Sequence, residues 1–147
     1  MIGKIIGLSL AAIAAVLTGC ASVPEAPPEM DQAAKAFAAP RDRAGVYVYR
    51  NETFGAAIKL NVLLDDRYLG ETASKTYFYT EVEPGIHTVT GKAENDSAVR
   101  FHAVAGRLYY IWQEIKMGLF QPRNELRLVD EATGRAGVLE SRRIATK

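Results

Sequence analysis

IKLNVLLDDRYL, at residues 58–69, is the stretch that decides the fold. Aliphatic side chains recur at every second position from Ile58 to Leu64, which is the pattern of a strand with one buried face. Asp65 and Asp66 then predict a tight turn, because their short polar side chains tolerate a left-handed backbone. The following residues return from this turn, so the stretch predicts a β-hairpin.

The same period of two continues along the rest of the chain. Turn residues such as Pro84-Gly85 and Ala105-Gly106 separate the alternating stretches. Further strands are predicted at 44–49, 75–82, 86–93, 97–104, 108–117 and 126–129. Seven or eight short strands at this spacing predict an all-β sandwich or barrel. An antiparallel β-sandwich over residues 42–147 is the favoured fold.

A short helix is predicted after the last strand. Asp130 is suited to cap a helix that runs to about Glu140. Gly134 and Gly137 lower the helix propensity of this segment.

Composition and charge indicate the class of protein and exclude one class of partner. The chain has 147 residues, of which 48% are hydrophobic and 24% charged, as in an ordinary globular protein of one domain. It has 18 Lys and Arg residues and 17 Asp and Glu residues. Removal of a segment that contains Lys4 would make the numbers of basic and acidic residues equal. Nucleic-acid binding normally needs a basic surface, so no nucleic-acid partner is expected.

The start of the chain has the composition of a secretory signal peptide. A short positive region, Met1 to Lys4, precedes a run of mostly apolar residues from Ile5 to Leu17. A helix that spans a bilayer needs about twenty apolar residues. This run is shorter, which favours a cleaved signal peptide at residues 1–19 over the alternative of a retained membrane anchor.

The end of the apolar run, Leu17-Thr18-Gly19-Cys20, resembles the lipobox of bacterial lipoproteins. That resemblance implies that a diacylglycerol is joined to the Cys20 thiol, that the chain is cut before Cys20, and that the new amino group is acylated. A modified residue explains a single cysteine in an exported protein better than a free thiol or an intermolecular bridge does. Because Ala21 rather than aspartate follows, the resemblance implies a lipid-anchored outer-membrane protein of a Gram-negative host, with its domain facing the periplasm.

Residues 20–41 are predicted to form the lipidated N-terminus and an Ala/Pro-rich spacer. Four of the six prolines lie in this segment. As a flexible coil it would span on the order of 25 Å, which keeps the domain near the membrane. A short helix from Asp31 to Ala39 is predicted within it, with Asp31 as its cap, and Phe37 is suited to pin the segment to the domain.

Three stretches resemble the PEGA-type β-sandwich, which favours an Ig-like or PEGA-like arrangement. They are LLDDRYLG at 63–70, TYFY at 76–79 and VEPGIHTV at 82–89, with Asp66 where glycine is usual. The wider pattern, from Phe37 to Val129, is similar to bacterial lipoproteins of the domain-of-unknown-function family twenty-eight forty-six. This resemblance names no activity and carries over no catalytic residue.

The sequence contains no strong catalytic or metal-binding motif. It lacks the nucleophile elbow, the phosphate-binding glycine loop and the zinc-protease helix. His87 and His102 fall on separate predicted strands without a second cysteine, so no zinc site is expected. The acidic groups at 65–66 and 94–96 are interpreted as turns, because a calcium loop needs more ligands. We expect no catalytic residues and no cofactor.

The strands are rich in aromatic residues, of which alternation would bury only half. For those that face outward, cross-strand pairs that steady a sheet are the favoured interpretation. An exposed surface for a protein or glycan partner is the alternative. The residues concerned are Tyr47, Tyr49, Tyr77, Phe78, Tyr79, Tyr109, Tyr110 and Trp112.

The loop MGLFQPRN, at 117–124, is unusually apolar for a connection between strands. Its Leu119 and Phe120 are predicted to plug the open end of the sandwich. The alternative is a docking patch, with Phe120 as the anchor and Arg123 as its polar neighbour.

Together these observations predict a membrane-anchored envelope lipoprotein whose small β-sandwich is a binding or structural module for an envelope protein or glycan. The alternative is an envelope-associated enzyme or an accessory factor of a secretion or surface-assembly system. A deep pocket that joins Glu114 or His102 to another titratable group would favour the enzyme.

Overall fold

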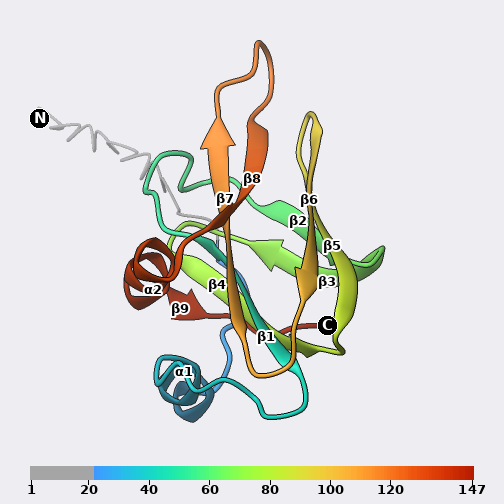
Figure 1. The fold of residues 1–147 in the computed structure, drawn as a ribbon. Helices are drawn as coiled ribbons and strands as arrows, with labels where there is room; N and C mark the ends of the chain where they lie inside the picture. Colours follow the sequence, from blue (N-terminus) through green and yellow to red (C-terminus); the bar gives the residue numbers. More distant parts are fainter. Residues whose placement is uncertain (1–21) are drawn as a thin grey trace, which may run out of the picture.

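The computed structural model describes residues 22–147, which form two packed β-sheets and two short helices (Figure 1). One sheet has five strands in the order β8-β7-β1-β4-β9, and the other has four in the order β3-β2-β5-β6. The predicted all-β sandwich with a short C-terminal helix is confirmed. The elements are α1 (Pro28–Ala34), β1 (Ala44–Arg50), β2 (Leu60–Leu64), β3 (Arg67–Thr72), β4 (Thr76–Val82), β5 (Gly85–Lys92), β6 (Asp96–Ala103), β7 (Leu108–Lys116), β8 (Arg123–Val129), α2 (Glu131–Leu139) and β9 (Arg142–Arg143).

The hairpin predicted from residues 58–69 is formed by β2 and β3. Asp65 and Asp66 have φ angles of 49° and 61°, so both occupy the left-handed region that a tight two-residue turn requires. The register shifts between Val62 and Leu63 through a β-bulge, which increases the local twist.

The five-stranded sheet is mixed, whereas the sequence predicted a wholly antiparallel sandwich. β1 is antiparallel to β4 but parallel to β7, and β9 is parallel to β4. The chain returns from β6 to the end at which β1 begins, where the Gly106 N–H donates to the Arg43 carbonyl at 2.9 Å. β7 therefore leaves in the same direction as β1, because both strands start from this end.

The main core lies between the two sheets and is mainly aliphatic. Val46, Val48 and Ile111 of the five-stranded sheet are fully buried, as are Val62 and Val89 of the other sheet. Alternation along β1 places its valines in this core and its tyrosines on the outer face of the sheet.

Both helices lie over the outer face of the five-stranded sheet (Figure 1). A layer of tyrosines covers this face beneath them. Ala34 of α1 and Val138 of α2 pack on this layer. The buried tyrosines of this layer therefore do not form an exposed surface for a partner. The four tyrosines that are at most 2% exposed are Tyr47, Tyr49, Tyr77 and Tyr110.

α2 forms as predicted, with Asp130 as its cap. The Asp130 carboxylate accepts a hydrogen bond from a backbone N–H of the first turn at 2.9 Å. A Cβ atom on Gly134 would lie 2.2 Å from Cγ of Tyr110, and one on Gly137 would lie 2.1 Å from Cε2 of Tyr49. The glycines that lower helix propensity are thus what allows α2 to lie directly on the tyrosines.

α1 begins earlier than predicted, after Pro27, and ends at Ala34. A proline suits the start of a helix because the first N–H groups have no acceptor within the helix. Asp31 lies inside α1 and is not its cap. Its carboxylate instead accepts hydrogen bonds from the Tyr77 hydroxyl at 2.6 Å and from the Arg143 backbone N–H at 3.0 Å.

The segment expected to be a flexible spacer is docked on the domain from Val23 onward. Val23 packs against the main core. The Ala26 N–H donates to the Arg143 carbonyl at 3.0 Å, and the Ala145 N–H donates to the Pro24 carbonyl at 3.0 Å. The packed part of the chain therefore extends well before residue 42, and the span of a free coil does not apply to it.

No helix within residues 22–147 is both long and apolar enough to cross a bilayer. The predicted signal peptide at 1–19 and the predicted lipidation site Cys20 lie outside the described residues.

Candidate functional site

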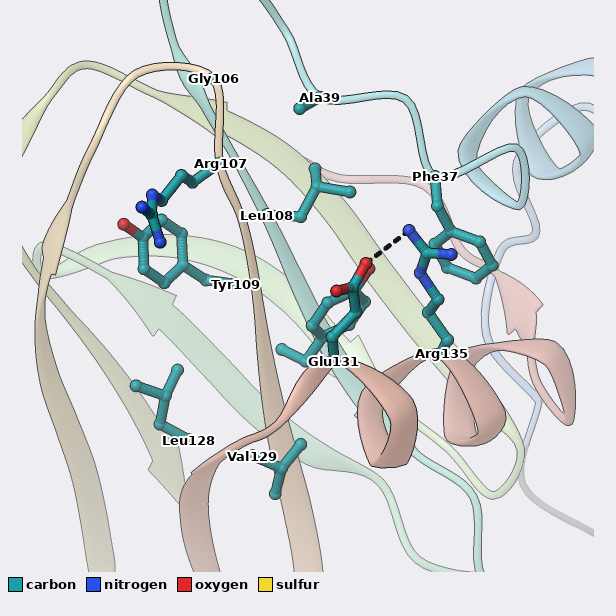
Figure 2. Close-up of a pocket in the computed structure, with 11 residues that line it drawn as sticks. Phe37, Ala39, Gly106, Arg107, Leu108, Tyr109, Leu128, Val129, Glu131 and Arg135 are labelled. Carbon is teal, nitrogen blue, oxygen red and sulfur yellow. Dashed lines mark ion pairs between the residues drawn. The ribbon is translucent and has the colours of Figure 1, made fainter.

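A groove of about 460 Å³ lies where β7 begins, between α2 and the turn that follows α1 (Figure 2). Four segments that are far apart in the sequence build it: the turn after α1, the start of β7, the end of β8 and the first turns of α2. The lining residues that matter below are Phe37, Arg107, Leu108, Leu128, Glu131 and Arg135.

Phe37 forms one wall of the groove because the chain reverses directly after α1. Its φ angle is 51°, the left-handed conformation that often ends a helix. Its ring centroid lies 5.7 Å from that of Tyr47 and 6.2 Å from that of Tyr110. The Arg135 guanidinium lies over the same ring at 4.9 Å, within the range of a cation–π interaction. Phe37 thus pins the N-terminal segment to the sheet.

Two charged residues of α2 set the electrostatics of the groove. Glu131 and Arg135 form an ion pair one helical turn apart (Figure 2). Burial raises the pKa of the Tyr110 hydroxyl, and the nearby Arg135 guanidinium offsets part of that rise. Within residues 22–147, neither the buried Tyr110 hydroxyl nor the buried Nε of Arg135 has a hydrogen-bond partner. Both atoms are closed off from solvent, and the Arg135 guanidinium lies near the Tyr110 hydroxyl, so these two side chains act on each other and their buried atoms are not open to a ligand.

The rest of the lining combines aliphatic side chains with one further cation. Leu108, Leu128 and Val129 supply aliphatic surface, and Leu128 is 48% exposed. Arg107 adds positive charge at the turn before β7. The lining residues of the described chain include no serine, cysteine or histidine. The groove therefore combines aliphatic walls with two arginines, which suits a segment that has apolar side chains next to hydrogen-bond acceptors or a carboxylate.

The apolar loop lies at the other end of β7, and it does not plug the sandwich. Leu119 and Phe120 are 90% and 95% exposed. β7 and β8 stay paired up to the loop, so the hairpin carries it beyond the body of the domain (Figure 1). Arg123 lies behind the loop, with its guanidinium 3.7 Å from the Glu94 carboxylate. The predicted plug is therefore wrong, and the docking patch stays a prediction.

A buried polar network occupies the region between the sheets near the base of this hairpin. The Thr72 hydroxyl donates to the Gln113 side-chain oxygen at 2.6 Å, and the Gln113 amide donates to the Asn124 side-chain oxygen at 3.2 Å. The Asn124 amide donates in turn to the Gly91 carbonyl at 3.2 Å. This network joins the two sheets and was missed from the sequence, because alternation of apolar residues gives no sign of paired amides.

His87 fastens the β2–β3 turn to β5. Its Nδ1 lies 2.5 Å from the Asp65 carboxylate and its Nε2 lies 2.6 Å from the Glu83 carbonyl. Burial lowers the pKa of His87, but the hydrogen bonds to these two partners outweigh burial, so that pKa lies above its usual value. His102 is exposed on β6. The contacts of His87 are those of a structural residue, in line with its interpretation from the sequence.

The other acidic positions also make structural contacts. The Glu114 carboxylate forms an ion pair with the Lys116 ammonium at 3.0 Å and another with Arg127 on the neighbouring strand. In the 94–96 turn, Asp96 pairs with the Lys92 ammonium at 2.7 Å. Residues 22–147 contain no group of three or more His, Cys, Asp or Glu side chains placed to hold a metal ion.

Arg50 is an important residue that the sequence pattern did not single out. Its side chain is fully buried at the end of β1. It donates to the Ile58 carbonyl at 2.7 Å, to the Gly55 carbonyl at 2.8 Å and to the Glu52 carboxylate at 3.0 Å. Burial lowers the pKa of Arg50 and raises that of Glu52. Arg50 therefore fixes the 51–58 loop, and the only sequence signal was an arginine that ends an alternating strand.

By its fold this chain is a two-sheet β-sandwich protein with helices on one outer face. It belongs to a family described as protein of unknown function (DUF2846), which matches residues 40–125, so the predicted resemblance to this family is confirmed. The chain is also similar to an uncharacterized protein of Haemophilus influenzae (strain ATCC 51907 / DSM 11121 / KW20 / Rd), with 32% identity over 132 residues that cover 88% of this chain and 79% of the relative. No solved structure matches. The family match includes the apolar loop but leaves out α1 and α2.

Proposed function

We propose that this chain is an envelope lipoprotein, anchored in the outer membrane through lipidated Cys20, whose β-sandwich faces the periplasm as a binding or structural module. The observation that carries the proposal is LTGC at 17–20, at the end of an apolar run of signal-peptide length. A diacylglycerol together with an N-linked acyl chain exceeds the two signals that stable anchoring requires.

The docked N-terminal segment supports a short connection between lipid and domain. Cys20 stands two residues before Ser22, where the described chain begins, and Val23 already packs against the core. A lipid on Cys20 would thus be joined almost directly to the folded domain. Such an anchor restrains how the domain sits on the bilayer, which a long spacer would not do.

The groove at the start of β7 supports a binding role and favours a protein segment as the ligand over a glycan. Sugar sites usually use exposed flat aromatic rings, whereas in this groove Arg135 covers the Phe37 ring and Tyr110 is only 2% exposed. Leu108, Leu128 and Val129 offer aliphatic walls. Arg107 and the Arg135 side chain, which is 43% exposed, supply positive charge for a carboxylate or backbone carbonyls. We therefore expect an apolar peptide segment of an envelope protein in this groove.

The anchor is tested with the full-length chain in a Gram-negative host grown with labelled palmitate. The native chain and the control Ser22→Ala are expected to carry the label, to show the lipid by mass and to fractionate with the outer membrane. Cys20→Ala is expected to show none of these properties. A native protein that is unlabelled and fractionates as soluble would contradict the anchor.

The groove is tested by photo-crosslinking in cells. A photoreactive residue at Leu128, which lines the groove and is 48% exposed, is compared with one at Leu139, which is 57% exposed on α2. We expect a discrete cross-link to one envelope protein at Leu128 only, and its loss when Arg107 is changed to Glu. Equal cross-linking at the two leucines, or none at either, would argue against the groove as the binding site.

A further inference from the structure

The hairpin of β7 and β8 ends in an apolar tip. Met117, Leu119 and Phe120 are 77%, 90% and 95% exposed, and Phe54 of the neighbouring loop is 53% exposed. These four residues, called the apolar tip below, line one shallow cavity of about 270 Å³ together with Ile58 and Pro122. Scattered single apolar residues are normal on a protein surface, whereas a contiguous group on a projecting hairpin marks a contact with a protein or a membrane.

The apolar tip lies at the end of the sandwich where the described chain begins. Ser22 and Val23 line a small cavity with Ser74 and Thr76. Thr76 pairs with Arg50, the last residue of β1. Because β1 and β7 are parallel, β7 also finishes at this end, and its last residues carry the tip.

A series of contacts leads from Ser22 and Val23, at the start of the described residues, to the apolar tip. The Ser74 hydroxyl donates to the Glu52 carbonyl, and the Arg50 guanidinium holds the same loop through the Gly55 carbonyl at 2.8 Å. Phe54 lies on that loop and borders the cavity that the hairpin residues line. The 51–58 loop thus lies between the entry of the chain and the apolar tip.

Two residue steps separate Cys20 from Ser22, and they span at most about 7 Å of extended chain. We propose that the apolar tip inserts into the interfacial region of the same bilayer that holds the lipid on Cys20. The inference rests on the proposed lipidation and adds a second, noncovalent contact. A lipid and an apolar hairpin on one end of a domain would fix its orientation on the membrane.

The charges next to the tip fit this position. Lys116 and Arg123 face each other in the last pair of β7 and β8, directly behind the apolar residues. Long basic side chains can keep their charges at headgroup level while the apolar residues enter the bilayer. Both have carboxylate partners, Glu125 at 3.4 Å and Glu94 at 3.7 Å. Insertion is therefore driven by apolar burial and should depend little on anionic lipid.

The proposed orientation has a consequence for the ligand. The groove lies at the start of β7, next to the turn that contains Gly106 and Arg107, which is the opposite end of that strand. With the tip in the bilayer, the groove would face away from the membrane. A partner would then approach from the aqueous side, without competing with the lipid surface.

The test uses two cysteine variants of the full chain, Leu119→Cys and the control Val104→Cys, each purified as the lipidated protein. A lipidated Cys20 has no free thiol, so each variant carries one reactive thiol for a nitrobenzoxadiazole label. Val104 is 46% exposed in the turn between β6 and β7, at the other end of β7. The labelled proteins are reconstituted into vesicles of phosphatidylethanolamine, with and without phosphatidylglycerol.

We expect the label at 119 to shift to shorter wavelength, to be quenched by nitroxide-labelled lipid, and to lose about threefold in quenching by aqueous iodide relative to the label at 104. Adding Phe120→Ser to Leu119→Cys should restore iodide quenching without lowering the melting temperature, because Phe120 is 95% exposed.

Each failure has its own signature. A lipidated protein whose two labels are equally open to iodide would overturn insertion and leave the anchor intact. A label at 119 that is shielded but not quenched by nitroxide lipid would place another copy of this chain on the tip, and would also overturn the proposal. Absence of the lipid by mass would show failure of the anchor before any label is measured.

Discussion

On the inner face of the five-stranded sheet, Val46, Val48 and Ile111 are fully buried against aliphatic residues of the second sheet. On the outer face the same strands present tyrosines, whose hydroxyl groups need polar partners when they are buried. Tyr47 finds one in the Ala34 carbonyl of α1 at 2.7 Å. The inner face therefore depends on apolar packing around these residues and on the Gln113–Asn124 network near the hairpin. The outer face depends on packing and on hydrogen bonds from the segments that cover it.

This difference explains why the N-terminal segment is part of the domain. Asp31 in α1 contacts Tyr77 in β4 and Arg143 in β9, which are 46 and 112 residues away in the sequence. Without α1 these polar groups would lose their partners, at a cost typical of buried unsatisfied atoms. The proposed lipid would thus sit beside a segment that stabilises the fold.

The largest effect is expected on the inner face. Phe78 is fully buried in the main core, and Phe78→Ala should lower the free energy of unfolding by about 3–5 kcal/mol, because it removes a large buried side chain and leaves a cavity. The measurement is denaturant unfolding followed by the fluorescence of Trp112. Phe120→Ala is the matched control and should change stability by less than about 0.5 kcal/mol, since surface substitutions usually do. A similar loss in both variants would remove the distinction between core and tip.

A smaller loss is expected where α2 meets the outer face. Gly134→Ala would raise helix stability by about 1 kcal/mol in an exposed helix. Here the new Cβ would lie 2.2 Å from the Tyr110 ring, so we expect a net loss of about 1–3 kcal/mol from overpacking. The same unfolding measurement separates helix propensity from overpacking. Ala136→Gly, at an exposed site of α2, is the control that reports helix propensity alone. A stabilised Gly134→Ala variant would show that α2 does not depend on close approach to the tyrosines.

The strands and the cap of α2 could be predicted because their signals are local. The alternation of apolar and polar residues identifies β2 without any knowledge of its partner strands. Asp130 caps α2 through a contact with the first turn of the same helix. The parallel pairing of β1 with β7 has no local signal, because it depends on where β6 returns the chain. β9 consists of Arg142 and Arg143 alone, too short for any period to show.

The candidate groove could not be predicted for the same reason. Phe37, Arg107, Leu128 and Arg135 lie in four separate segments, and none of them belongs to a motif. Leu119 and Phe120 were identified because an apolar loop is unusual in itself. Their exposure depends on how far the β7–β8 pairing continues, and the sequence left that open.

The smallest effect is expected from pH at Asp31, which lies on the outer face. Burial raises the pKa of Asp31, but hydrogen bonds from Tyr77, Lys35 and the Arg143 backbone outweigh burial and hold that pKa below its usual value of 3.8. A carboxyl whose pKa is lower in the folded state stabilises the fold above its unfolded pKa, and this contribution is lost as pH falls through the folded value.

The stability of the native protein should therefore fall more steeply below about pH 4 than that of Asp31→Asn. Because the Asp31 side chain is 25% exposed, we expect a difference of about 1 kcal/mol or less between the two pH profiles. The measurement is denaturant unfolding at a series of pH values, with Glu29→Gln, an exposed acid of the same helix, as the control that should follow the native curve. Parallel curves for all three proteins would mean that α1 is held by apolar contacts alone, and the two faces of the sheet would then differ in shape but not in the kind of force that stabilises them.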